Sequence, residues 1–372
     1  MRYNSLLNAY SFKKILLRLN NKGSYFYIFK SQRFIIHPIL LSLLSQNKLI
    51  MNKIAIVGPI PRDTIITHND EIIKKYGCAT HPAIALAKLM KNSGEVIVIS
   101  HVHKKDQQPI QELFKPYKNV NVSGIKSDQD RGTVIELRFL DQNNRLEKQT
   151  AFMNPILPED VAPFLDANAF VFVPITDFEI SLSTLQFIKK NSNALTIFDA
   201  HGPTTAMNIN GNRQRKYWTD RDEWLPFIDV LKMNLEESLC CWFKNEYSID
   251  EMGIYDEDDT DHLDAFATYV LSKGVKVLYV TLDSRGCVAY SIKKGKMVID
   301  WIESIPVTEV IDTTGCGDSF AGGLAYGFTY HNDLIKAAQY ANTLGAMRTQ
   351  GKTYEVFKDL KGTDEIIEKQ YN

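Results

Sequence analysis

A run of small residues around one acid is the part of this sequence best suited to chemistry. It reads Asp312-Thr313-Thr314-Gly315-Cys316-Gly317-Asp318-Ser319-Phe320-Ala321-Gly322-Gly323. A turn of small residues that leads into a helix leaves backbone N–H groups without partners, and the helix dipole adds positive potential there. Such a place favours an anion. Asp318 among these donors is suited to take a proton from a hydroxyl that attacks a bound phosphate.

The alternative is that glycines and an acid merely cap a helix, because both are common at helix starts. The surrounding pattern favours catalysis. An apolar stretch, Ile305 to Ile311, precedes the run and predicts a strand, while Phe320, Leu324 and Phe328 follow at helical spacing. Strand, loop and helix therefore come in the order expected of a phosphate-binding turn.

The run resembles the signature of the ribokinase-like (PfkB-type) family of sugar and nucleoside kinases, Asp-Thr-x-Gly-Ala-Gly-Asp-x-Phe. Only Cys316 departs, in place of the usual Ala. The resemblance implies phosphorylation of a hydroxyl group with ATP and a divalent metal such as Mg²⁺. It implies Asp318 as the base, the amides of Gly315, Cys316 and Gly317 as the anion hole, and a monovalent cation such as K⁺ near Asp312 and Thr314.

Two further places are candidates for substrate binding. Asp63 follows the first strand, where ligands of open α/β sheets bind, and a carboxylate can accept two hydroxyl hydrogen bonds. Gly77 to His81 resembles the family's Gly-Gly-x-x-x-Asn signature, with one matched glycine, Gly77, and with His81 in the place of Asn. A neutral histidine can also donate and accept. Helix or turn capping is the alternative interpretation of both places.

Candidate nucleotide-binding residues follow three later segments. Asn234 and Glu237 resemble the family's Asn-x-x-Glu, in which the acid organises the metal through water; an N-capped helix is the alternative. Thr281 and Gly286 fit a Thr-x-Gly-x-x-Gly pattern in which Asp283 replaces the first glycine. An Asp tolerates positive φ better than most residues. The remaining candidates are Asn342, predicted to line the adenine pocket, and Asp199 with His201, which stands for the Asn of Asp-x-Asn.

Composition excludes some classes of function. Of 43 basic and 44 acidic residues, eight basic and no acidic ones lie in residues 1–50, so 35 and 44 remain from Met51 onward. This net charge of −9 argues against a nucleic-acid partner. The five cysteines have no metal-ligand spacing and suit a reducing compartment, so we expect a cytoplasmic protein with a small-molecule substrate.

Residues 1–50 differ from the rest and are predicted to lie outside the fold. Three interpretations compete: an extension from a start assigned too early, with Met51 as the true first residue; an organelle transit peptide; and a membrane anchor at Phe34 to Leu44. That last stretch is far shorter than the roughly 20 residues that span a bilayer. The first interpretation is favoured, because the segment lacks the Ser and Arg richness of transit peptides.

Strands and helices alternate from Lys53 onward, which predicts an α/β fold. Apolar strands are expected at 54–57, 96–100, 120–122, 170–173, 195–198, 230–233 and 277–281, with helices at 82–90, 180–190, 264–272 and 333–347. This predicts a three-layer α/β/α, mostly parallel sheet over residues 51–372. A hairpin, 134–140 with 148–152, predicts a small β lid inserted at about 120–152, through which a homodimer could form.

The sequence therefore predicts an ATP-dependent phosphotransferase acting on a hydroxyl of a small sugar. Two alternatives remain open. A nucleoside kinase would need apolar walls for the base, for which Phe139, Phe152 and Phe172 are available. A catalytically silent regulator of the same fold would explain the altered glycine motif and Asp283, although it would have no need of an intact Asp318 run.

Overall fold

The computed structural model describes residues 17–19, 25–29, 32–35, 51–67, 69–140, 145–242, 256 and 258–372. The chain divides into two compact units, 1–51 and 52–372. In the first unit, β1 (Leu17–Leu19), β2 (Tyr25–Phe29) and β3 (Gln32–Ile35) form an antiparallel sheet. The interpretation of residues 1–50 as an extension stays a prediction. No helix in the described part of the chain has the length and apolar character needed to cross a membrane.

The second unit is built on a nine-stranded sheet in the order β18-β17-β16-β15-β12-β11-β4-β7-β8. The strands from β16 to β8 run parallel, and β17 and β18 are antiparallel additions at one edge. Their bounds are β4 (Asn52–Val57), β7 (Gly94–His101), β8 (Val120–Lys126), β11 (Ala169–Phe172), β12 (Leu195–Asp199), β15 (Val230–Asn234), β16 (Val277–Thr281), β17 (Cys287–Lys293) and β18 (Lys296–Ile302).

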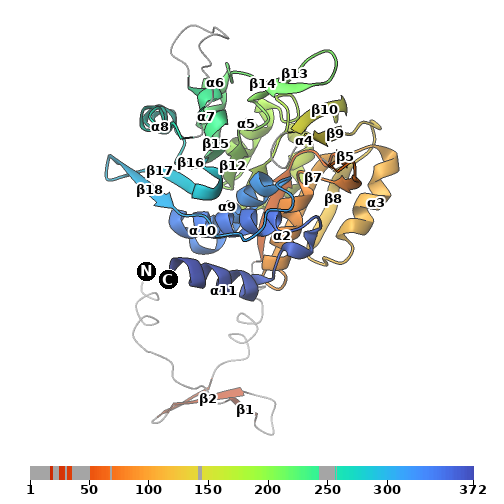
Figure 1. Cartoon of the computed structure of the whole chain (residues 1–372). Helices are drawn as coiled ribbons and strands as arrows, with labels where there is room; N and C mark the ends of the chain where they lie inside the picture. The colour runs from red at the N-terminus through yellow and green to blue at the C-terminus, as the bar shows by residue number, and fades with distance from the viewer. Residues whose placement is uncertain are drawn as a thin grey trace. The chain divides into compact units, whose positions relative to one another are not determined.

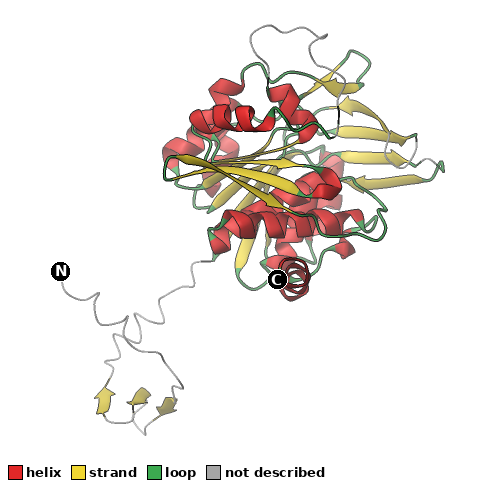
Figure 2. Cartoon of the chain, turned by 60° about the vertical axis from the view of Figure 1, so that its left-hand side comes forward, coloured by secondary structure: helices red, strands yellow, loops and turns green. Residues whose placement is uncertain are grey.

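Helices cover both faces of this sheet, as Figures 1 and 2 show. One face carries α2 (Thr80–Leu89), α3 (Lys104–Phe114), α9 (Cys316–His331), α10 (Leu334–Thr349) and α11 (Leu360–Tyr371). The other carries α4 (Pro158–Val161), α5 (Leu182–Asn191), α6 (Arg221–Trp224), α7 (Leu235–Cys241) and α8 (Leu263–Ser272). Short 3₁₀ turns are η1 (Ala162–Phe164), η2 (Leu225–Phe227), η4 (Asp283–Arg285) and η5 (Tyr354–Val356).

The period-2 alternation of each strand explains the three layers. In β4, Ile54 and Ile56 belong to the core under α2 and α9, whereas Ala55 and Val57 belong to the core under α5 and α8. Because both faces are buried, the parallel strands are almost continuously apolar. The predicted α/β/α architecture is confirmed.

The lid differs from the prediction in its composition. It is a four-stranded sheet in the order β10-β9-β5-β6, made of β5 (Arg62–Ile66), β6 (Ile72–Tyr76), β9 (Val134–Phe139) and β10 (Arg145–Ala151). The predicted hairpin is present as β9 and β10, with its turn outside the described residues. A second hairpin, β5 and β6, joins it through a parallel β5–β9 pair.

One predicted strand was correct but misplaced, and another was wrong. Residues 120–122, assigned to the lid, begin β8, which pairs with β7 at the edge of the main sheet. The stretch 305–311, predicted as a strand, lies in a loop. Pro306 has no N–H for a ladder, and Val310 and Ile311 are exposed rather than buried. A further two-stranded hairpin, β13 (Thr205–Met207) with β14 (Arg213–Arg215), contacts the lid at Gln149, whose N–H donates to Gly211 O.

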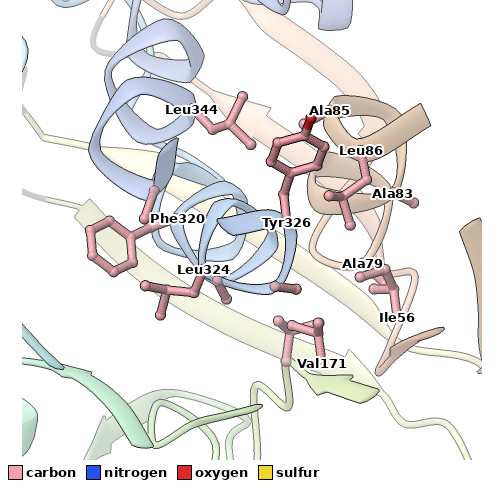
Figure 3. Packing of buried hydrophobic residues seen from close by; sticks show 14 of the residues in the cluster. Ile56, Ala79, Ala83, Ala85, Leu86, Val171, Phe320, Leu324, Tyr326 and Leu344 are labelled. Atoms are coloured by element: carbon pink, nitrogen blue, oxygen red, sulfur yellow. The ribbon is translucent and has the colours of Figure 1, made fainter. Parts of the chain in front are cut away.

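Helix α9 is held in the core by unusually close packing (Figure 3). Phe320 and Leu324 are buried on the side of α9 that faces the sheet. On the side that faces α10, a Cβ added at Gly323 would lie 2.5 Å from Ala341 Cα, and one at Gly327 would lie 2.2 Å from Ala337 Cα. The two glycines therefore let the helix backbones approach closely, and this contact positions the start of α9.

This packing predicts opposite effects of the same substitution at two helical glycines. Gly327→Ala should lower the free energy of unfolding by about 1–3 kcal/mol, because the new methyl meets backbone that cannot move aside. Gly345→Ala in α10 should raise it by about 0.5–1 kcal/mol, because its methyl makes ordinary contacts and alanine favours the helix. Urea unfolding midpoints measure both, and equal shifts for the pair would contradict the close-packing argument.

Candidate active site

The predicted site residues gather at the carboxyl end of the parallel sheet. Asp199, Asn234 and Thr281 are the last residues of β12, β15 and β16. In the sheet register, Asp199 lies beside Lys232 and Asn234 beside Thr281. This is the edge at which open α/β sheets bind ligands.

The loop before α9 has the geometry of an anion hole. Gly315 has φ 86°, a left-handed conformation, and a Cβ there would lie 2.2 Å from His81 Cδ2. A Cβ at Gly317 would lie 2.9 Å from Lys232 Nζ. Gly315 therefore needs glycine, whereas a side chain at Gly317 would displace the Lys232 ammonium. The Cys316 amide donates to Thr313 O at 3.2 Å and the Ser319 amide to Gly315 O, so the amides between them are the ones left at the helix start.

Asp318 stands in the first turn of α9. Burial and, to a smaller extent, the nearby Asp199 carboxylate together raise the pKa of its carboxyl to about 6, against the opposing effect of Lys232. Its Oδ1 lies 3.6 Å from Cys78 Sγ. A base whose pKa lies near the operating pH combines a useful deprotonated fraction with a real affinity for the proton.

Asp63 faces the same place from β5 of the lid. A Cβ at Gly77 would lie 2.1 Å from Asp63 Oδ2, and the next residue, Cys78, contacts Asp318. The two carboxylates therefore lie at one turn, which explains why Gly77 carries no side chain. Burial raises the pKa of Asp63 to about 8; Lys75 lowers it and Asp318 raises it. The structure therefore places Asp63, the predicted substrate-binding acid, close to Asp318, the predicted base.

His81 supports the anion-hole loop. Its side chain is buried, its Nδ1 accepts a hydrogen bond of 3.1 Å from Arg348 Nε, and its ring packs against Gly315. Burial and the Arg348 charge hold the pKa of His81 well below its usual range, so the ring is neutral and Nε2 carries the proton. That Nε2 has no hydrogen-bond partner in the described part of the protein.

Asp312 already has two basic partners. Its Oδ2 lies 2.6 Å from both Lys75 Nζ and Arg348 Nη2, and its Oδ1 accepts the Thr314 N–H at 2.9 Å. Although burial opposes it, Lys75 and Arg348 hold the pKa of Asp312 well below its usual range. The Thr314 hydroxyl is buried without a hydrogen-bond partner among the described residues.

Asn234 and Glu237 form a capping box at the start of α7. Asn234 Oδ1 accepts the Glu237 N–H at 2.7 Å, and Glu237 Oε2 accepts the Asn234 N–H at 2.9 Å. The capping alternative is thus correct as structure, and it does not exclude a functional role. Glu237 Oε1 also contacts His201 Nδ1 at 2.9 Å and Arg215 at 3.2 Å. These groups outweigh burial and hold the pKa of Glu237 below its usual range.

Lys232 is a residue of the candidate site that the sequence interpretation missed. It is the one charged residue in the apolar strand β15, and its buried ammonium lies 2.8 Å from Asp199 Oδ2 and against Gly317. Despite burial, Asp199 and Glu237 raise its pKa, so it stays charged. A buried lysine inside a β-strand was the available signal, because such a charge needs a partner or a ligand.

The remaining candidates are placed as follows. Asp283 has φ 52°, as the expected positive-φ turn requires, and its side chain is exposed. Gly286, with φ 96°, closes that turn where a Cβ would lie 2.1 Å from Ile302 O. Thr281 Oγ1 contacts Met233 O at 3.4 Å. Asn342 is buried, and its Nδ2 donates to Glu303 O at 2.9 Å, so this amide ties α10 to the end of β18.

The site has an excess of negative charge around Lys232. Four carboxylates and two basic side chains meet there: Asp199, Glu236, Glu237 and Asp318 with Lys232 and Arg215. Burial raises the pKa of Asp199, and Glu237 adds a smaller rise, although the paired Lys232 opposes both. Hard carboxylate oxygens suit Mg²⁺. Within the described residues no three His, Cys, Asp or Glu side chains are grouped as direct ligands of one metal ion, so a metal here would be held through its own waters.

The family profile and two relatives that match this chain are those of sugar or riboside kinases. Residues 77–354 match the profile described as pfkB family carbohydrate kinase. Aminoimidazole riboside kinase of Salmonella typhimurium is 22% identical over 318 residues, 81% of this chain and 90% of that protein. A Lactococcus lactis ribokinase is 23% identical over 338 residues, 84% and 98% of the two chains.

Solved structures agree on the fold. Ribokinase from Giardia lamblia superposes with a TM-score of 0.65 at 19% identity, over 86% of this chain and 99% of that one. A pyrophosphate-dependent kinase of the ribokinase family, complexed with a pyrophosphate analog and myo-inositol, gives 0.63 at 17% identity, over 82% and 98%. The predicted ribokinase-like fold is confirmed.

The raised pKa of Asp63 predicts how stability changes with pH. Its folded pKa of about 8 exceeds the ordinary value of 3.8, so the folded state binds the extra proton and stability falls as pH rises between these values. Asp63→Asn removes this loss. The melting temperature of the variant minus that of the wild type should therefore be larger at pH 9 than at pH 5, as differential scanning fluorimetry measures.

Asp160→Asn is the matched control with the opposite sign. Asp160 is also buried, but His101, Lys126 and the Leu157 N–H hold its pKa below its usual range despite burial. Its ionised form therefore stabilises the fold above pH 4, and the variant should melt lower than the wild type at both pH values. If the two variants changed in parallel with pH, the burial of an ionisable Asp63 would be refuted.

Proposed function

Because the chain belongs to the pfkB family of carbohydrate kinases, we propose that it transfers the γ-phosphoryl group of ATP to a hydroxyl of a small sugar. The observation that carries this proposal is the position of Asp318, a carboxylate with a pKa of about 6 in the first turn of α9. It stands beside the amides that would receive the transferring group, and opposite the lid acid Asp63.

Different residues of the site would perform proton transfer and charge stabilisation. Asp318 takes the proton of the attacking hydroxyl as the bond to phosphorus forms. The amides of Gly315 and Gly317 and the helix dipole stabilise the charge on the transferring phosphoryl group. The Cys316 amide, also predicted for the anion hole, donates to Thr313 O instead. The Lys232 ammonium, which lies against Gly317, adds a full positive charge at the same place.

A sugar is favoured over a nucleoside by the polarity of the lid side of the site. Asp63 approaches from β5, and Arg213 and Glu147, which pair at 3.2 Å, lie within its electrostatic reach. Of the three aromatic residues available for a base, Phe172 is fully buried in the core against Phe198. Carboxylates and a guanidinium suit the hydroxyls of a polyol better than the face of a base.

ATP and Mg²⁺ complete the proposal. Thr281, Gly286 and Asn234 stand on adjacent loops at the sheet edge where the nucleotide would lie. Asp199 and Glu237 would hold Mg²⁺ through its waters. When bound, the metal neutralises charge on the donor phosphates. Asn342 would contribute through its place in α10 rather than through its amide, whose donors already bind main-chain carbonyls.

Two finer points belong to the proposal. The five cysteines are free, which agrees with a cytoplasmic location. A homodimer through the lid is supported by apolar side chains on the lid strands and their connections, of which Ile72, Leu140 and Leu146 are all about 60% exposed. Apolar side chains so exposed on a small sheet often mark an interface.

Replacement of Asp318 by asparagine tests the proposed function. Asp318→Asn keeps the shape of the side chain and removes the base, so turnover should fall at least about a hundredfold while ATP still binds. In the wild type, kcat/KM should rise with pH through about 6, because only the ionised carboxylate accepts the proton. A panel of sugars and nucleosides with ATP and Mg²⁺, coupled to ADP detection, measures both.

The outcomes separate the candidates. Activity on sugars alone supports the proposal, and preference for nucleosides would replace its substrate class. ATP binding without turnover on any acceptor would indicate the silent regulator. Near-normal turnover of Asp318→Asn would remove Asp318 from the role of base.

The lid dimer has its own test. Ile72→Glu with Leu146→Glu places two charges on the exposed lid strands, so a dimer formed there should dissociate. Sedimentation equilibrium should give twice the chain mass for the wild type and one chain mass for the variant. A wild-type monomer, or a variant dimer, would contradict the interface.

A further inference from the structure

The oxygen atoms around Asp312 are already occupied by protein N–H groups. Lys75 Nζ and Arg348 Nη2 both lie 2.6 Å from Asp312 Oδ2. The Arg348 side chain is 1% exposed, and those of Lys75 and Asp312 are each 11% exposed. Arg348 Nη1 also donates to Gly351 O, and Arg348 Nε donates to His81 Nδ1. One guanidinium therefore joins a carboxylate, a carbonyl and an imidazole.

This arrangement does not fit a monovalent cation. Such an ion needs several oxygen ligands at once, and the Asp312 carboxylate and Gly351 carbonyl are used by Arg348. Of the predicted cation ligands, the Thr314 hydroxyl alone is without a partner among the described residues, which is too little for an ion. Lys75 and Arg348 carry two positive charges and Asp312 one negative charge, so the cluster already has a net positive charge. A further cation would be repelled at this buried position, where water screens charge poorly.

The same contacts supply what a bound cation would supply. Arg348 bridges Asp312, at the start of the anion-hole loop, to Gly351, beyond the end of α10. Through His81 it also reaches Gly315. Lys75 adds a link to the lid, since it lies in β6 opposite Asp63 of β5. The loop that shapes the anion hole is thus held by contacts to Gly351, to His81 and to the lid strand β6.

We propose that Lys75 and Arg348 act as a built-in cation that holds the loop 312–315 in its anion-binding shape, so that phosphoryl transfer needs no K⁺. This inference deepens the proposed kinase function and rests on it. Both residues are positioning residues, because they act through Asp312 and His81. The expectation of a K⁺ site at Asp312 and Thr314 is withdrawn, because the protein's own charges fill it.

Activity in different salts is the first test. Wild-type turnover should agree within about twofold in KCl and in tetramethylammonium chloride of equal ionic strength near 0.1 M. Lys75→Met removes one charge from Asp312 and should lower turnover on the order of a hundredfold in tetramethylammonium, because the loop loses a fixed contact. Addition of K⁺ should restore most of that loss, more effectively than Li⁺.

Lys352→Met is the matched control. Lys352 also joins the lid to the segment after α10, through Glu71 at 2.7 Å, but both side chains of that pair are about half exposed. An exposed pair contributes little, so this variant should behave as the wild type in every salt. Arg348→Met is a poorer test, because loss of a fully buried arginine threatens folding.

Rubidium, a heavy substitute for K⁺, provides a readout that needs no substrate. Anomalous diffraction from crystals soaked in RbCl should show no ion beside Asp312 in the wild type and an ion there in Lys75→Met. A rubidium ion beside Asp312 in the wild type, wild-type turnover that depends on K⁺, or a Lys75→Met variant that K⁺ does not restore would overturn the proposal. If no acceptor were phosphorylated in any salt, the proposed function would fail while the rubidium result still decided the cation question.

Discussion

The burial of several charges at the amino end of α9 is the constraint on which the site depends. Charges taken out of water must be paired or neutralised, and here they separate into two groups on either side of the anion-hole loop. Around Lys232 the carboxylates are in excess, and Glu237 helps to raise the pKa of Asp199. Around Asp312 the basic side chains are in excess. In the function proposed above, the first group would accept a divalent cation through its waters, and in the further inference the second would exclude a monovalent one.

The geometry of the helix start depends on the close approaches of several glycines. Gly315 meets the His81 ring and Gly317 meets the Lys232 ammonium, while Gly323 and Gly327 bring α9 against α10. The start of α9 is therefore held by the main-chain packing of α9 against α10 and by the charged side chains around the loop. Because α9 cannot shift without displacing α10, the amides and Asp318 keep their relative places, which is the pre-organisation that electrostatic catalysis requires.

The local pattern was sufficient to predict the parallel strands, several of the helices and the place of Asp318, since each depends on residues close in sequence. It did not predict β17, β18, α3 or α11. It was insufficient where partners are distant. Lys75 and Arg348 lie 237 and 36 residues from Asp312, and nothing in either local sequence signals the pairing. The strand β5 was not predicted, although burial alternates from Arg62 to Ile66 as in a strand. Asp63 was therefore predicted as a substrate acid that follows the first strand, whereas it lies within β5.

The two histidines that replace asparagines of the family pattern clarify what kind of protein this is. His81 accepts a hydrogen bond from Arg348, and His201 accepts one of 2.9 Å from Arg213 through Nε2. Each ring then turns its other side to the site, His81 to Gly315 and His201 to Glu237. An imidazole spans a distance that the shorter asparagine amide cannot, so each exchange goes together with an arginine that uses the added reach. Both substituted positions therefore have a partner, His81 with Arg348 and His201 with Arg213, and neither leaves its histidine without a role in the structure around the buried Asp318.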